Sequence, residues 1–149
     1  FGCGEIEKSI VYLNRIINRT TTLRTDLQCY ARLLHLIAHY ELGNYDLLEY
    51  LTKSVYRFMA KMQNLGLVEK ELFRFLRNSF FIESKDMDKA LAELKENLKK
   101  YEGNKTELRA YLYLDVISWL ESKMQKTGTP QDVIRMKYLQ RQRKHAKTL

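Results

Sequence analysis

His35 and His39 are four residues apart, a spacing at which two imidazoles on one helix face can share a metal ion. Gln28 and Arg32 continue the same stripe towards the N-terminus. A third ligand is not evident, because Cys29 faces away from the stripe, and Arg32 would repel a cation. We therefore expect no metal site. We interpret the stripe as a polar line at a groove or at the solvent surface, where it could also contact a binding partner.

Two further stripes are basic and lie on successive expected helices. Their members are Lys53, Arg57 and Lys61 on the first helix, and Lys70, Arg74 and Arg77 on the second. If these helices are antiparallel neighbours, the stripes join into one positive strip that could hold an acidic peptide or a phosphate backbone. The alternative is an ordinary mixed-charge outer face, which helices commonly have. The acidic residues available to balance it are Glu49, Glu69 and Glu71.

Sequence signatures of catalysis are missing. The chain has no dinucleotide-binding glycine loop, no phosphate-binding lysine loop, no nucleophile elbow and no paired zinc ligands. Glu69 and Glu71 point to different faces of one helix, and we expect them to be solvated. Asp86 and Asp88 are explained by the favourable effect of acidic residues at the start of a helix. The sequence therefore predicts a non-catalytic protein without a cofactor.

The net charge of +8 belongs mainly to the C-terminal end. The chain has 26 basic and 18 acidic residues, but six of the basic ones and none of the acidic ones lie in residues 133–149. Residues 1–132 are therefore close to neutral, and a basic tail follows them. The two cysteines, Cys3 and Cys29, show neither a disulfide framework nor a metal spacing, which favours buried thiols in a reducing, cytoplasmic setting. Apolar runs long enough to cross a membrane are absent from the sequence.

All six glycines, and the single Pro130, fall where an apolar pattern of helical period stops. The pattern predicts an all-α fold of about seven helices joined by short turns. The expected N-caps of the later helices are Thr25 (with Gln28), Asn44, Ser84, Asn104 (with Glu107) and Thr129. The expected helices cover about residues 5–19, 26–42, 45–63, 68–81, 86–101 and 105–126, and a seventh runs from Pro130 into the basic tail.

One segment of the chain recurs. Phe1-x-x-Gly4-Glu5-Ile6 matches Tyr40-x-x-Gly43-Asn44-Tyr45 at a shift of 39 residues, and a looser third copy surrounds Asp86 and Met87. Each copy places a turn before a large apolar residue at a helix start. This pattern resembles the turn of tetratricopeptide repeats, although the shift exceeds that family's period of about 34 residues. The resemblance implies antiparallel helical hairpins stacked as a right-handed solenoid that holds other proteins.

The resemblance also suggests how the chain is organised. Residues 1–132 would form a repeat domain with an incomplete first hairpin, followed by the basic end at 133–149. The helix that pairs with residues 5–19 would then lie upstream in a longer chain, so we expect an exposed apolar stripe formed by Ile10, Leu13 and Ile17. The resulting hypothesis is a scaffold or adaptor that binds a protein or peptide. The alternative is a nucleic-acid-associated regulator that uses the basic tail and an upstream reader domain.

Overall fold

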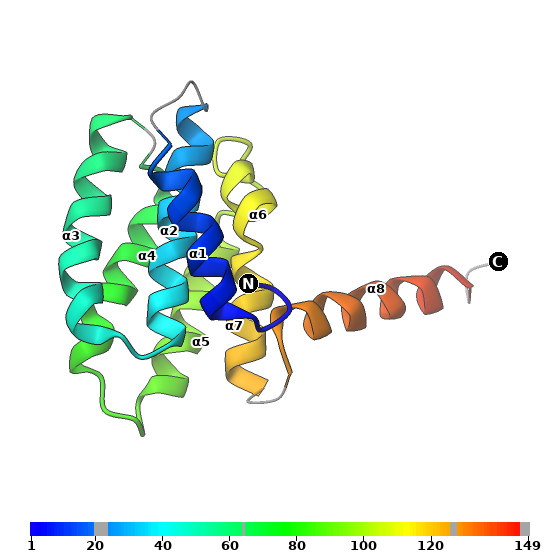
Figure 1. Ribbon diagram of the computed structural model, residues 1–149. Coiled ribbons are helices and arrows are strands. Elements are labelled where there is room, and N and C mark those ends of the chain that lie inside the picture. Colours follow the sequence, from blue (N-terminus) through cyan, green and yellow to red (C-terminus); the bar gives the residue numbers. More distant parts are fainter. Residues whose placement is uncertain (20–23, 64, 126–127, 147–149) are drawn as a thin grey trace.

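The computed structural model describes residues 1–19, 24–63, 65–125 and 128–146, except for the side chains of 144–146. These residues form eight α-helices and one short 3-10 helix, with no strand among them (Figure 1). The all-α fold class is confirmed. The helices are α1 (Ile6–Ile17), α2 (Thr25–Glu41), α3 (Tyr45–Lys61), α4 (Leu67–Asn78), the 3-10 helix η1 (Ser79–Phe81), α5 (Met87–Lys99), α6 (Leu108–Leu114), α7 (Val116–Gln125) and α8 (Pro130–Ala146).

The expected single helix over residues 105–126 is wrong, and the described helices number eight instead of about seven. Asp115 interrupts the run because its backbone is left-handed, with φ 39° and ψ 48°. Its carboxylate accepts a hydrogen bond from the N–H of Ser118 (3.3 Å) at the start of α7. Asp tolerates this backbone conformation better than most residues because its short polar side chain can hydrogen-bond locally. The break therefore separates α6 from α7 without a glycine or a proline.

The turns before α1 and α3 share one backbone geometry. In each, the N–H of the glycine (Gly4 or Gly43) donates to the carbonyl oxygen three residues earlier, at 2.9 and 3.1 Å. Each glycine carbonyl accepts from the N–H two residues later, at 2.9 Å in both turns. Both glycines have positive φ, 82° and 69°, which other residues rarely adopt. The sequence match at a shift of 39 therefore extends to the backbone geometry of the two turns. The third copy differs, because Lys85 occupies the position of the glycine and does not have a positive φ.

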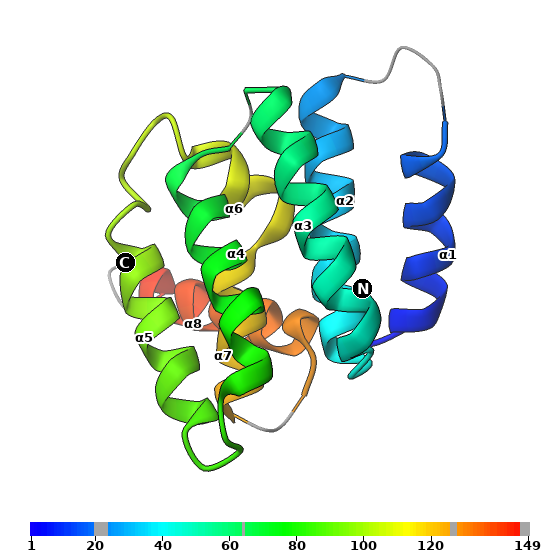
Figure 2. The ribbon, with the colours of Figure 1, turned by 90° about the vertical axis from the view of Figure 1, so that its left-hand side faces the viewer.

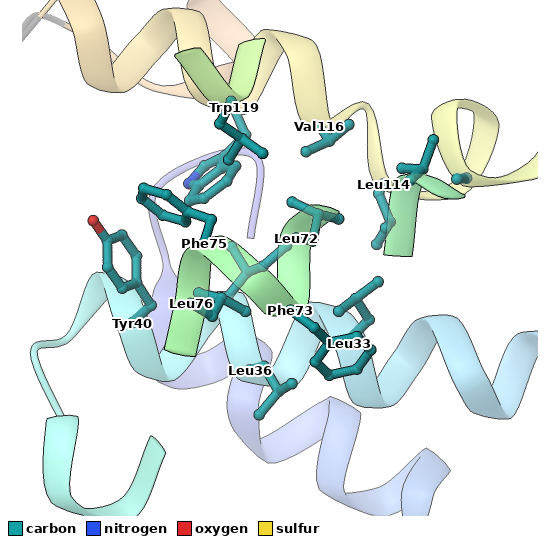
Figure 3. Close-up of a cluster of buried hydrophobic side chains, with 14 of the residues drawn as sticks. Leu33, Leu36, Tyr40, Leu72, Phe73, Phe75, Leu76, Leu114, Val116 and Trp119 are labelled. Carbon is teal, nitrogen blue, oxygen red and sulfur yellow. The ribbon is translucent and has the colours of Figure 1, made fainter. Parts of the chain in front are cut away.

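The core joins helices that are distant along the chain. Figure 3 shows Tyr40 of α2, Phe75 of α4 and Trp119 of α7 in one cluster. The ring centroids of Tyr40 lie 5.7 Å from Phe75 and 6.1 Å from Trp119, in edge-to-face arrangements. Buried side chains from α2 through α7 belong to the same cluster. The expected solenoid is not confirmed, because a strictly serial stack would not bring α2 against α7.

A polar contact fixes the same long-range pairing. The indole Nε1 of Trp119 donates to Glu41 Oε1 (2.6 Å), and Lys123 Nζ donates to Glu41 Oε2 (3.0 Å). Both oxygens of this carboxylate, at the end of α2, are therefore used by α7. Because one partner is charged, such hydrogen bonds are stronger than neutral ones.

α1 packs along α2, and its predicted apolar stripe is mostly covered. Leu13 is buried, and Ile10 and Ile17 are half-buried, so the expectation of an exposed stripe at these positions is wrong for Leu13 and only partly right for the other two. The exposed apolar side chains of α1 are instead Val11, Tyr12 and Ile16.

α8 extends away from the other helices (Figure 1). Its start has the expected N-cap: Thr129 Oγ1 accepts from the N–H of Asp132 (3.4 Å), and the N–H and Oγ1 of Thr129 donate to Asp132 Oδ2, at 2.7 and 2.9 Å. Val133 is buried, and Lys137 Nζ lies 2.8 Å from Glu121 Oε2 of α7. After Lys137 the described side chains of α8 are exposed.

Three other capping predictions need correction. Thr25 is the first residue of α2, so Arg24 takes the N-cap position, and Asp86, not Ser84, precedes α5. Asn104 accepts from the N–H of Thr106 (2.9 Å) in the turn before α6, but Glu107 takes the N-cap position of that helix. Cys29 is buried as expected, but Cys3 is exposed. None of the described helices is long and apolar enough to span a membrane.

Candidate binding groove

A cavity of about 750 Å³ lies between α3 and α4, and side chains of η1 also line it. α3 and α4 run antiparallel as neighbours (Figure 2), which is the arrangement needed to join the two basic stripes. We call this cavity the basic groove. The side chains that line it are Glu49, Thr52, Lys53, Tyr56, Arg57, Lys70, Phe73, Arg74, Arg77, Phe80 and Phe81.

Five of the six predicted basic residues line the groove. Lys53 and Arg57 come from α3, and Lys70, Arg74 and Arg77 come from α4. Lys61, near the end of α3, is exposed but does not line the cavity. Residues three or four apart share a helix face, so each helix presents its cations as a row along one edge of the groove.

These positive charges are only partly neutralised. Lys53 Nζ lies 2.8 Å from Glu49 Oε1, and Arg74 donates to both oxygens of Glu71 at 3.0 and 3.2 Å. The remaining three cations of the groove are Arg57, Lys70 and Arg77. Within the described residues, these three have no carboxylate oxygen within 4.0 Å. The groove therefore carries a net positive charge on a molecule whose body is nearly neutral.

Aromatic side chains form the apolar part of the groove. Tyr56 of α3 meets Phe73 of α4 edge to face, with ring centroids 5.4 Å apart. Phe73 is buried, whereas Tyr56 is 43% exposed. Phe80 is half-buried, and Phe81, at the end of η1, is 87% exposed. The basic pattern identified the cations from sequence, but the contribution of these rings depends on the antiparallel pairing and was not predicted.

The polar line of α2 is buried at His35 and His39, so the interpretation as a line at a groove or at the surface is wrong for these two residues, whereas Gln28 and Arg32 are half-buried. Gln28 Nε2 donates to the carbonyl oxygen of Ile16 (3.2 Å), at the end of α1. Arg32 hydrogen-bonds Gln28, and its guanidinium carbon stands 3.9 Å from the ring centroid of Phe58 on α3. These two residues therefore hold α1 and α3 against α2.

His35 and His39 complete this line as a buried pair. Their Nε2 atoms are 3.2 Å apart, and Asn44 Nδ2 lies 3.1 Å from His39 Nδ1. Since an amide nitrogen can only donate, His39 accepts at Nδ1 and donates from Nε2 to His35. Burial, and then the charge of His39, lower the pKa of His35 to about 4, and burial also lowers the pKa of His39.

A pair of buried carboxyl groups was missed by sequence reasoning. Glu69 was expected to be solvated, but it is buried and its Oε2 atom has no hydrogen-bond partner among the described atoms. Glu107 is also buried and accepts from the N–H of Val68 (3.1 Å) at the start of α4. Both carboxyl groups face Gly66, where an added Cβ would meet each Oε2 at 2.6 Å. Burial first, and the charge of Glu107 next among the raising effects, raise the pKa of Glu69.

No group of three or more His, Cys, Asp or Glu side chains that could hold a metal ion occurs within the part of the chain that the structure describes.

The comparisons with known proteins add no assignment: no protein-family model matches the chain, and no curated protein and no solved structure matches it significantly. We take the basic groove as the candidate site because five cations line one cavity together with the exposed rings of Tyr56 and Phe81.

Proposed function

We propose that this chain is a non-catalytic binding module that holds an acidic segment of a protein partner in the basic groove. The observation that carries the proposal is the meeting of Arg57, Lys70 and Arg77, none neutralised by a described carboxylate, around the exposed Tyr56 and Phe81. Arg and aromatic side chains are enriched among the residues that dominate binding at protein interfaces. The low cysteine count favours a cytoplasmic site of action.

We also retain the tetratricopeptide-like origin as a proposal. Its support is the shared geometry of the turns at Gly4 and Gly43. Tyr12 and Ile16 are exposed on α1, and at the shift of 39 they correspond to two positions of α3. These two positions share a helix face with Phe58, and the guanidinium of Arg32 on α2 lies over the Phe58 ring. A helix upstream of α1 in a longer protein would cover this face as α2 covers α3. The module would then be the end of a scaffold or adaptor.

The alternative is binding of nucleic acid through α8. The projecting part of α8 exposes Arg135, Arg141 and Arg143, and residues 133–149 contain no acidic residue. Binding to phosphates of this kind is non-specific and weakens steeply as salt rises. We rank it second because the described basic side chains of α8 are spread around the helix and do not form a stripe.

The experiment compares labelled acidic, neutral and basic peptides of equal length by fluorescence anisotropy. We expect only the acidic peptide to bind the full chain. The double variant R57E/R77E should weaken its binding by roughly tenfold, since rim charges contribute modestly at each position. A variant lacking residues 138–149, which keeps the buried Val133 and the contact of Lys137 with Glu121, should bind as well as the full chain. Equal binding of all three peptides, or loss of binding on removal of 138–149, would contradict the proposal.

A further inference from the structure

The internal sequence match allows the face of α3 that lines the basic groove to be compared with the matching face of α1. At the shift of 39, three residues of α1 that face α2 correspond to three residues of α3 that line the groove: Ile10, Leu13 and Ile17 correspond to Glu49, Thr52 and Tyr56. α2 packs extensively along α1, and Leu13 is buried there. α4 contacts α3 much less extensively, and Tyr56 remains 43% exposed. The groove therefore lies on a helix face whose counterpart on α1 is covered by a helix.

We propose that the occupant of the basic groove is an acidic amphipathic α-helix of a partner protein. This inference rests on the proposed function and adds the conformation and side-chain pattern of the ligand. Cations repeat at intervals of about one helical turn along both edges, at Lys53 and Arg57 on α3 and at Lys70, Arg74 and Arg77 on α4. A helix with Asp or Glu at positions i and i+4 on both flanks matches two such rows.

The aromatic rings define the third requirement on the ligand. Between the two basic rows, the exposed surfaces are those of Tyr56 and, at the end of the groove, Phe81. An apolar ridge on the ligand helix, between its acidic flanks, covers these rings. Recognition of an amphipathic helix in a groove commonly depends on a few apolar anchors spaced by three or four residues.

The groove suits a carboxylate-bearing helix better than a nucleic acid. Its walls hold Glu49 beside Lys53, and Glu71 is hydrogen-bonded to Arg74, so a continuous phosphate backbone would pass close to two fixed carboxylates. Of the rings that line the groove, Phe73 is buried and Phe80 is half-buried, so stacked bases would have only Tyr56 and Phe81, which lies at the end of the groove. Discrete carboxylates on a helix can avoid these positions and reach Arg57, Lys70 and Arg77.

The test uses three labelled probes of about 16 residues, roughly four helical turns. The first carries a leucine ridge flanked by glutamates at helical spacing. The second has the same length and net charge, with its leucines and glutamates in scrambled order and prolines at two central positions. The third is a single-stranded oligothymidine of similar length. Binding to the full chain is measured by anisotropy, and the gain of helix on mixing is measured by circular dichroism. The variants are R57E/R77E and F81A, whose side chains are exposed, with K89E/K105E as the matched control away from the groove.

We expect the amphipathic peptide to bind, to gain helix and to lose roughly tenfold in affinity with R57E/R77E or F81A, but less than about twofold with K89E/K105E. If the scrambled peptide binds equally and neither peptide gains helix, the helical ligand is excluded while acidic-segment binding stands. If neither peptide binds, both the inference and the proposed function are wrong. Binding of oligothymidine alone would replace both with the nucleic-acid alternative.

Discussion

At the residue scale, two buried polar pairs show opposite dependence on pH. Glu69 and Glu107 bring two carboxyl groups together at the start of α4, where burial raises the pKa of Glu69. His35 and His39 bring two imidazoles together on α2, where burial lowers both pKa values. In each case burial favours the neutral form of the side chain. Stability should therefore fall at both ends of the pH range, for different reasons.

Replacement of Glu69 by Gln should stabilise the protein at pH 8. Because the folded-state pKa of Glu69 lies above its ordinary value of 4.5, stability is lost as pH rises through the folded-state pKa. Glutamine removes this loss and can donate a hydrogen bond to Glu107. Thermal unfolding should show a higher Tm for E69Q at pH 8 and a smaller gain at pH 5. The exposed control E93Q should be neutral, and a lower Tm for E69Q at both pH values would contradict the burial argument.

The histidine pair should make the protein sensitive to mild acid. Since the pKa of His35 falls from 6.5 to about 4 on folding, the stability it contributes is complete above pH 6.5 and is lost as pH falls towards 4. For His35 alone, the loss between pH 7 and pH 5 is about 2 kcal/mol. Urea unfolding at the two pH values should show this decrease in the wild type and a much smaller one in H35Q/H39Q. An unchanged pH dependence in the double variant would show that other groups cause it.

At the scale of elements, Asp115 decides whether α6 and α7 are one helix or two. Its left-handed backbone would cost Ala about 1–2 kcal/mol, and loss of the hydrogen bond to Ser118 would add about 1 kcal/mol. We expect D115A to be destabilised by that order in urea unfolding and D115G to be destabilised less, because glycine loses the hydrogen bond but adopts positive φ without strain. If D115A were as stable as the wild type, the argument that strain at this position and the hydrogen bond to Ser118 distinguish Asp from Ala would be wrong.

The helix pattern was predictable where glycine, proline or a cap marked a turn, and it was missed where no such marker was present or where a contact distant in sequence decided the outcome. Glycines and Pro130 marked the turns, and the cap formed by Thr129 and Asp132 is as expected. The break at Asp115 has no such marker, because apolar residues continue on both sides of it. Glu69 is buried near Glu107, which lies far away along the chain, and no local pattern reports that proximity.

At the scale of the whole molecule, short-range similarity did not determine how the helices assemble. The turns at Gly4 and Gly43 are alike, yet Glu41 of α2 binds Trp119 and Lys123 of α7, which a series of stacked pairs would not require. The basic stripes were visible in the sequence because their spacing is helical. The two stripes line one groove because α3 and α4 are antiparallel neighbours. The same pairing places aromatic side chains in that groove.

The most direct test of the central claim is a titration of the full, ¹⁵N-labelled chain with the acidic amphipathic peptide, followed through amide chemical shifts. Binding in the basic groove predicts the largest changes at Lys53, Arg57, Arg77 and Phe81, with α8 unaffected. Changes confined to α8, or no changes at peptide concentrations far above that of the protein, would contradict the assignment of the groove as the binding surface.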